Sequence, residues 1–318
     1  MGALGRIADP GFRLLGLRPE ALPLSTTWIP RGTAQARRRL NEGRFDAVLA
    51  TGPPFAALIA ARRAAGDVPL VVELRDLWAG NPAYDRGGPI LRRLESWVVS
   101  EAAAVIGVTR EAAADLRRRH PGARVEEIPN GFEPELLDLR RPSSGAATTI
   151  LHSGTLTVDR PLEPLLRVLP PALRLVLHGY VAPEIQREIE ASPAQVEIVP
   201  PSGWKDAIQR IAAADVALVT QARGAGDATA VAAKVYEYLA LGKPVLSITH
   251  GGATEALLRR LGADGLCARL DDETTIRAAL DRIEAGDLPP PVPPEKLEPY
   301  ERPGLAQGLV ELLDTVVA

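Results

Sequence analysis

Two cations in separate parts of the sequence are candidates for binding a phosphorylated ligand. Arg160 closes a short segment in which Gly154 lets the backbone turn tightly and approach a ligand. Lys234 begins a predicted helix further along the chain. An arginine can bind a diphosphate through its forked N–H donors, and the start of a helix favours an anion. These residues therefore predict an anion-binding site, with solvated surface cations as the alternative.

A carboxylate one helical turn after Lys234 adds a second kind of chemistry. Glu237 is three residues from Lys234, so the two side chains share one face of the predicted helix. A carboxylate in this place can accept hydrogen bonds from both hydroxyls of a ribose. The alternative is a surface ion pair, worth well under ~1 kcal/mol. Just upstream, residues 224–229 have the composition of a flexible loop of the kind that closes over a ligand.

Short apolar segments that alternate with amphipathic ones must position these side chains. The predicted strands cover residues 47–50, 70–74, 104–108, 125–128, 148–152, 174–178, 196–199, 216–219 and 244–248. Helical patterns between them include residues 92–101, 111–119, 162–169, 204–213 and 232–241. This alternation predicts an α/β fold with parallel sheets covered on both faces. Ligands bind beyond the carboxyl ends of such strands, which is where the residues of interest lie.

Two turn-rich segments divide the chain. Residues 140–145 are polar and precede a new strand, so residues 1–142 are predicted to form one domain and residues 146–298 a second. The proline-rich segment 288–294 predicts a stiff extended linker. We expect residues 300–318, which end in a helix, to cross back to the first domain; a cap on the second domain is the alternative.

Composition excludes several classes of protein. The 318 residues carry a net charge of −3, which argues against nucleic-acid binding. The single cysteine excludes an internal disulfide and a cysteine-based metal site, and it fits a reducing cytosol. The four histidines lack metal-ligand spacing, and no segment is apolar for the ~20 residues that a membrane span needs. We expect a cytoplasmic protein, with peripheral association at the inner face of the membrane as an alternative.

Five segments in the expected order resemble the retaining family 4 glycosyltransferases of the GT-B fold. Residues 234–246 resemble the nucleotide-sugar motif Lys-x-x-Glu-Tyr-x-Ala-x-Gly-Lys-Pro of the bacterial branch that builds surface polysaccharide and lipid-linked sugars. The spacing from Gly154 to Arg160 is similar to that family's glycine-to-basic step. Further similar segments are residues 51–54 (Thr-Gly-Pro-Pro), 71–78 (Val-Val-Glu-Leu-Arg-Asp-Leu-Trp) and 127–132 (Glu-Ile-Pro-Asn-Gly-Phe). The resemblance implies two Rossmann-like domains that face each other across a cleft.

The resemblance also implies roles for residues on the donor side. Arg160 and Lys234 would hold the donor diphosphate and stabilise the charge that grows on the leaving nucleoside diphosphate. Glu237 would bind the ribose, and Gly154 would give access to the backbone. The remaining donor-side residues are Val199 and Pro201 at the base, and Asp227 and Thr229 at the sugar.

On the acceptor side the resemblance implies catalytic roles for Arg75 and Asp76. It further implies transfer with retention of configuration, no metal, and no cofactor besides a UDP- or GDP-linked sugar as substrate. The expected acceptor is a glycan or a lipid-linked molecule.

The sequence departs from the family pattern in three places. Thr229 stands where many members have a glutamate, and Arg75 and Asp76 stand where some relatives use a histidine. Residues 1–40 show neither the apolar strand nor the glycine-rich loop with which relatives begin, so the first strand–helix unit is expected to be missing. The missing unit motivates one alternative, a non-catalytic partner subunit that binds nucleotide sugars. A second alternative is a sugar-nucleotide epimerase, since such enzymes share the two-domain architecture.

Overall fold

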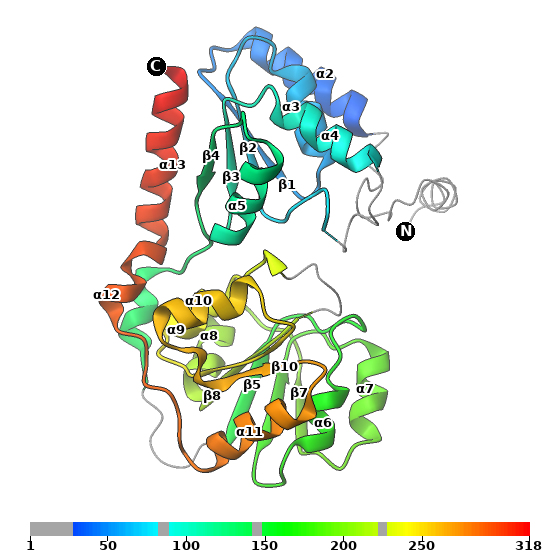
Figure 1. Ribbon diagram of the computed structural model, residues 1–318, viewed down its shortest axis with the longest axis vertical. Coiled ribbons are helices and arrows are strands. Elements are labelled where there is room, and N and C mark those ends of the chain that lie inside the picture. Colours follow the sequence, from blue (N-terminus) through cyan, green and yellow to red (C-terminus); the bar gives the residue numbers. More distant parts are fainter. Residues whose placement is uncertain (1–27, 82–88, 142–147, 222–227) are drawn as a thin grey trace. The chain divides into compact units, whose positions relative to one another are not determined.

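The computed structural model describes residues 28–81, 89–141, 148–221 and 228–318 (Figure 1). Contacts within the chain define two compact units. Unit 1 comprises Met1–Pro129 together with Ala306–Ala318, and unit 2 comprises Asn130–Leu305. Each unit is built on its own sheet of parallel strands. The expected missing strand–helix unit concerns mainly residues 1–27, which lie outside the described residues.

Unit 1 contains a four-stranded parallel sheet in the order β1-β2-β3-β4. Its strands are β1 (Val48–Gly52), β2 (Leu70–Leu74), β3 (Ala104–Gly107) and β4 (Val125–Glu127). In chain order, its helices include α2 (Trp28–Glu42), α3 (Ala56–Ala64), α4 (Pro89–Val99) and α5 (Arg110–Arg119). Apolar residues of β1 to β4 and of these four helices form one continuous core.

The C-terminal helix covers part of the other face of this sheet. Helix α13 (Arg302–Val317) runs alongside this sheet (Figure 1). Its Leu312 packs against Val71, Ala104 and Ile106 of β2 and β3. Its Leu309, Leu313 and Val316 pack against the same cluster.

Unit 2 contains a six-stranded parallel sheet in the order β10-β9-β8-β5-β6-β7. Its strands are β5 (Thr149–Ser153), β6 (Arg174–His178), β7 (Val196–Val199), β8 (Val216–Thr220), β9 (Val245–Thr249) and β10 (Cys267–Arg269). The chain moves outward from β5 through β6 to β7, then returns to place β8 on the other side of β5. The order of strands therefore reverses between β5 and β8, and this reversal point is where such sheets bind ligands.

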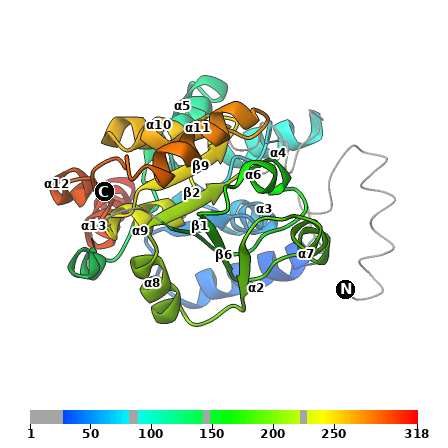
Figure 2. The ribbon, with the colours of Figure 1, turned by 90° about the horizontal axis from the view of Figure 1, so that it is seen from below.

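Helices cover both faces of this sheet (Figure 2). One core lies between the sheet and α8 (Trp204–Ala213), α9 (Lys234–Ala240) and α10 (Ala253–Leu261). The other lies between the sheet and α6 (Glu163–Val168), α7 (Pro183–Glu190) and α11 (Glu273–Glu284). Alternate residues of β5 divide between them, with Ile150 in the second core and Leu151 in the first. The predicted fold class, an α/β protein with parallel sheets in two Rossmann-like halves, is confirmed.

Candidate functional site

Lys234 and Gly154 meet at the carboxyl end of β5. Gly154 has a φ of +136°, a backbone conformation that residues other than glycine rarely adopt. A Cβ built at this position would lie 2.5 Å from Nζ of Lys234. The lysine ammonium therefore occupies the space that a side chain at position 154 would need, and a glycine is required for this approach.

Arg160 brings a second cation to the same sheet edge. Its Nη1 donates a hydrogen bond to the carbonyl oxygen of Thr220, the last residue of β8, at 3.0 Å. The pKa of Lys234 falls to about 8, mainly because burial disfavours the ammonium and further because Arg160 is close, while Glu237 opposes the change. Within the described part of the chain, neither Arg160 nor Lys234 forms an ion pair with a carboxylate. The structure thus brings together two cations whose charge is available to an anion.

A buried histidine on β5 contacts Lys234. His152 lies on β5 with only 1% of its surface exposed. Its Nδ1 is 3.2 Å from the carbonyl oxygen of Leu218 on β8, and its Nε2 is 3.4 Å from Nζ of Lys234. Burial, and secondarily the charge of Lys234, hold the pKa of His152 well below its usual value, so the imidazole is neutral.

Tyr238 supports the same loop from the next turn of α9. Its buried hydroxyl accepts a hydrogen bond from the backbone N–H of Ser153 at 3.2 Å. Burial raises the pKa of this hydroxyl above its usual value, so it stays protonated. Neither His152 nor Tyr238 is among the site residues predicted from the sequence. The signal that marks His152 is a polar residue inside an otherwise apolar strand segment.

Glu237 is held by a side chain from a different helix. The indole Nε1–H of Trp204, the first residue of α8, donates to Oε1 of Glu237 at 3.1 Å. Trp204 is half-exposed, and Glu237 follows Lys234 by one turn of α9. Lys234 and Glu237 therefore stand one turn apart on α9, as predicted, without an ion pair between them. The second carboxylate oxygen of Glu237 has no partner in the hydrogen bonds that the structure shows among described residues.

The adjacent strand ends are connected by His178. This histidine lies at the end of β6 and is buried. Its two ring nitrogens contact Oγ of Ser153 at 3.1 Å and Oγ of Ser202 at 3.0 Å. Val199 ends β7 and Pro201 follows it in the same loop as Ser202, so both predicted residues lie at the carboxyl edge of the sheet.

Two further predicted residues belong to the loop that precedes α9. Thr229 is partly buried in the segment leading to Lys234, and Asp227 lies outside the described residues.

Arg75 and Asp76 belong to unit 1, where they follow β2 directly. Arg75 is exposed, and its Nη2 donates to the carbonyl oxygen of Pro53. The segment that follows them is fixed by Trp78, whose ring stacks on Phe55 with centroids 5.0 Å apart. The two predicted residues therefore stand at the carboxyl edge of the first sheet on an anchored segment.

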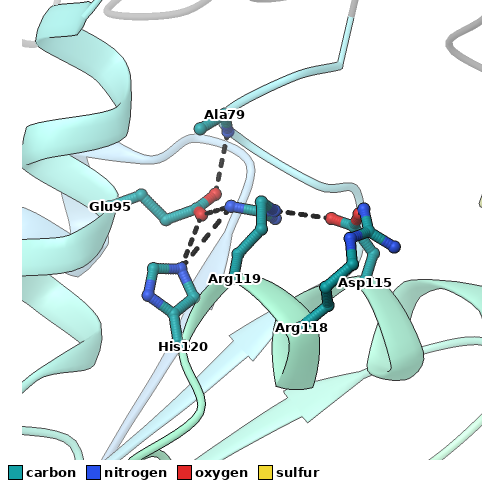
Figure 3. Close-up of polar contacts among 6 residues, drawn as sticks. All are labelled: Ala79, Glu95, Asp115, Arg118, Arg119 and His120. Atoms are coloured by element: carbon teal, nitrogen blue, oxygen red, sulfur yellow. Dashed lines mark hydrogen bonds and ion pairs between the residues drawn. The ribbon is translucent and has the colours of Figure 1, made fainter.

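A buried carboxylate completes this anchor (Figure 3). Oε2 of Glu95, on α4, accepts a hydrogen bond from the backbone N–H of Ala79 at 2.8 Å. Its other oxygen contacts Arg119 and lies 2.9 Å from Nε2 of His120. Arg119 continues the network, because its Nε donates to Asp115 at 2.6 Å. Glu95 thus holds the segment after β2 to the end of α5.

Two other kinds of site have no candidate among the described residues. No group of three or more histidine, cysteine, aspartate or glutamate side chains is placed to hold a metal ion there. Among those same residues, no helix combines the length and apolar character needed to cross a membrane.

Part of the sequence matches a known family model, and the fold is similar to that of several solved structures. Residues 2–131 match a family model described as a glycosyl transferase 4-like domain. The fold is similar to that of Anabaena HepE in complex with UDP and glucose, with a TM-score of 0.70 and 16% identity over 92% of this chain and 83% of HepE. It is similar to the lipopolysaccharide outer core galactosyltransferase WaaB, with a TM-score of 0.64 and 13% identity over 92% of this chain and 81% of WaaB.

A third similar structure is the trehalose 6-phosphate synthase of Burkholderia multivorans. Its TM-score is 0.65, with 14% identity over 91% of this chain and 76% of the synthase. No curated protein sequence matches the chain. The shared architecture is that of GT-B glycosyltransferase structures.

Proposed function

We propose that the chain is a glycosyltransferase that moves a sugar from a UDP- or GDP-linked donor to a glycan or lipid-linked acceptor. The observation that carries this proposal is the pair of cations at the reversal point of the second sheet. Arg160 and Lys234 come from different segments and meet where such folds bind ligands, and neither is neutralised by a described carboxylate. The family match over residues 2–131 and the GT-B structural neighbours, one of them in complex with UDP, support nucleotide-sugar transfer.

The donor side can perform the part of the reaction that needs most stabilisation. As the bond from sugar to diphosphate breaks, negative charge grows on the leaving nucleoside diphosphate. Arg160 and Lys234 provide fixed positive charge at that place, which lowers the energy of the transition state. Glu237 presents a carboxylate oxygen to the ribose hydroxyls, while Gly154 leaves room for the ligand beside the backbone.

The remaining predicted residues complete this proposal. Val199 and Pro201 would contact the base, and Asp227 and Thr229 the sugar. Arg75 and Asp76 would act at the acceptor, on a segment that Trp78 anchors. In this proposal the transfer retains the configuration of the sugar, requires no metal, and takes place at the cytoplasmic face of the membrane where the acceptor is lipid-linked.

Titration calorimetry with UDP, GDP and their common sugar conjugates tests the donor site. One nucleotide should bind to the wild type, and Lys234→Ala should weaken that binding by roughly ten- to a hundredfold, because a hydrogen bond to a charged group contributes ~1.5–3 kcal/mol. Glu237→Ala should weaken it as well. Lys296→Ala, at an exposed lysine on α12 (Pro294–Leu297), is the matched control and should bind normally. Unchanged affinity in folded Lys234→Ala and Glu237→Ala proteins would refute the proposed site.

Product analysis separates transfer from the other two functions that fit the sequence. An epimerase alters the donor when no acceptor is present, whereas a transferase requires an acceptor. A partner subunit binds the donor without turnover. The anomeric configuration of the product, determined by NMR in the presence of EDTA, tests both retention and independence of metal.

A further inference from the structure

We infer that His152 is a positioning residue that holds the ammonium of Lys234 in place above Gly154. The inference rests on the proposed donor site, since it explains how one of its two cations is fixed. Three contacts carry it: Leu218 to His152, His152 to Lys234, and the close approach of Lys234 to Gly154.

The first contact determines which ring nitrogen carries the proton. A carbonyl oxygen can only accept a hydrogen bond, so Nδ1 of His152, 3.2 Å from the oxygen of Leu218, is the protonated nitrogen. Nε2 then carries a lone pair and accepts from Nζ of Lys234. A doubly protonated ring would direct an N–H at the ammonium, and burial of His152 disfavours that form. The carbonyl oxygen of Leu218 on β8 thus selects the tautomer of His152 on β5. In that tautomer, His152 accepts a hydrogen bond from Lys234 on α9.

The kind of group that accepts the hydrogen bond from Lys234 matters for the binding of an anion. A carboxylate in place of His152 would hold the lysine more strongly, but it would also cancel the charge that the donor diphosphate needs. A neutral imidazole restrains the ammonium and leaves its charge available. The charged groups acting on Lys234 are Arg160, from the segment after β5, and Glu237, on α9. Their effects oppose each other, so the neutral His152 adds orientation without changing the balance of charge.

The role of His152 can be measured on the lysine itself. The protein has only four lysines, so NMR of the lysine Cε carbons gives few signals, and the signal of Lys234 is assigned by its loss in Lys234→Ala. In the wild type this signal should titrate near pH 8. In His152→Leu the ammonium loses an acceptor, so its titration should move to lower pH. In His152→Gln, which keeps an acceptor oxygen, the titration should return toward that of the wild type.

Nucleotide binding provides the second measurement. His152→Leu should weaken UDP or GDP binding about tenfold, the low end for a bond to a charged group because the contact is long. In a Lys234→Ala background the same substitution should change affinity less than about twofold, since a residue that acts only through Lys234 has nothing left to position.

Either of two results overturns the inference. One is a Lys234 titration that is the same in the wild type and in His152→Leu. The other is an equal loss of affinity from His152→Leu with and without Lys234, which would indicate general damage to the sheet. Failure of the wild type to bind any nucleotide would refute the proposed function, and the lysine titration would still decide whether His152 holds Lys234.

Discussion

Substitution of Gly154 with alanine is the smallest change that should disable the proposed donor site. The added methyl carbon would lie 2.5 Å from Nζ of Lys234, well inside the distance of ordinary contact, and 3.5 Å from its Cε, which is an ordinary contact. The atoms in the way are the flexible end of a side chain, so the lysine will move rather than the backbone. The ammonium would then leave both the loop and its contact with His152.

This substitution should affect two measurable quantities for separate reasons. The φ of +136° is strained for alanine, which should lower the free energy of unfolding by about 1–3 kcal/mol. Displacement of Lys234 should remove a charge-assisted contact to the ligand, worth ~1.5–3 kcal/mol, and so weaken nucleotide binding roughly ten- to a hundredfold. Urea unfolding followed by circular dichroism measures the first quantity, and titration calorimetry measures the second.

Gly262→Ala is the matched control for this prediction. Gly262 lies between α10 and the amino end of β10, has a φ of +74°, and the nearest atom to a Cβ there would be Nζ of Lys296 at 4.0 Å. It should therefore lose similar stability while nucleotide affinity stays near that of the wild type. The reasoning would be refuted by normal affinity in Gly154→Ala, or by an equal loss of affinity in both variants.

Three other predictions test the remaining contacts. Tyr238→Phe leaves a backbone N–H at the end of β5 without its acceptor, and should lower the free energy of unfolding in urea by ~1–3 kcal/mol; no measurable loss would contradict the bond. Glu95→Ala leaves the guanidinium of Arg119 without its buried partner and should cost ~3–5 kcal/mol by the same measurement. Glu42→Ala, which breaks an exposed ion pair with Arg38, should cost under ~1 kcal/mol, and equal losses in the two variants would contradict the buried role. UDP affinity should fall as pH rises through about 8, because Lys234 is charged below its pKa and neutral above it; a flat profile from about pH 7.5 to 9.5, above the last phosphate ionisation, would contradict this assignment.

Local pattern was sufficient to predict most of the fold. Each strand of unit 2 except β10 was expected within a few residues of its observed place, because each contains a run of at least two consecutive valine, isoleucine or leucine residues. Strand β10, Cys267–Arg269, has three residues and ends in an exposed arginine, so it carries no such run. Its place at the edge of the sheet depends on pairing with β9, which the local sequence does not specify.

For the site as well, individual residues could be predicted from the local sequence, whereas contacts between residues far apart in the chain could not. Arg160, Lys234 and Glu237 could be picked out from local sequence, because Arg160 stands in the segment between β5 and α6 and the other two stand in the first turn of α9. The contacts that hold them were not predicted, because they join residues far apart in the chain. His152 and Leu218 meet only because the chain returns to place β8 beside β5, and Trp204 reaches Glu237 only because α8 and α9 lie on one face. Strand order therefore decides which side chains support the cations.

The means of support explains why this edge of the sheet suits an anion. Arg160 is held by the carbonyl oxygen of Thr220, and Lys234 by an imidazole that itself depends on the carbonyl oxygen of Leu218. Both carbonyls belong to β8, whose parallel neighbours direct their carboxyl ends to the same edge. Neutral acceptors give the cations fixed positions without neutralising them, and a carboxylate could not do so. Replacement of His152 by an acid should therefore tighten the hold on Lys234 and weaken the binding of a nucleoside diphosphate, a pair of effects that a purely steric role would not produce.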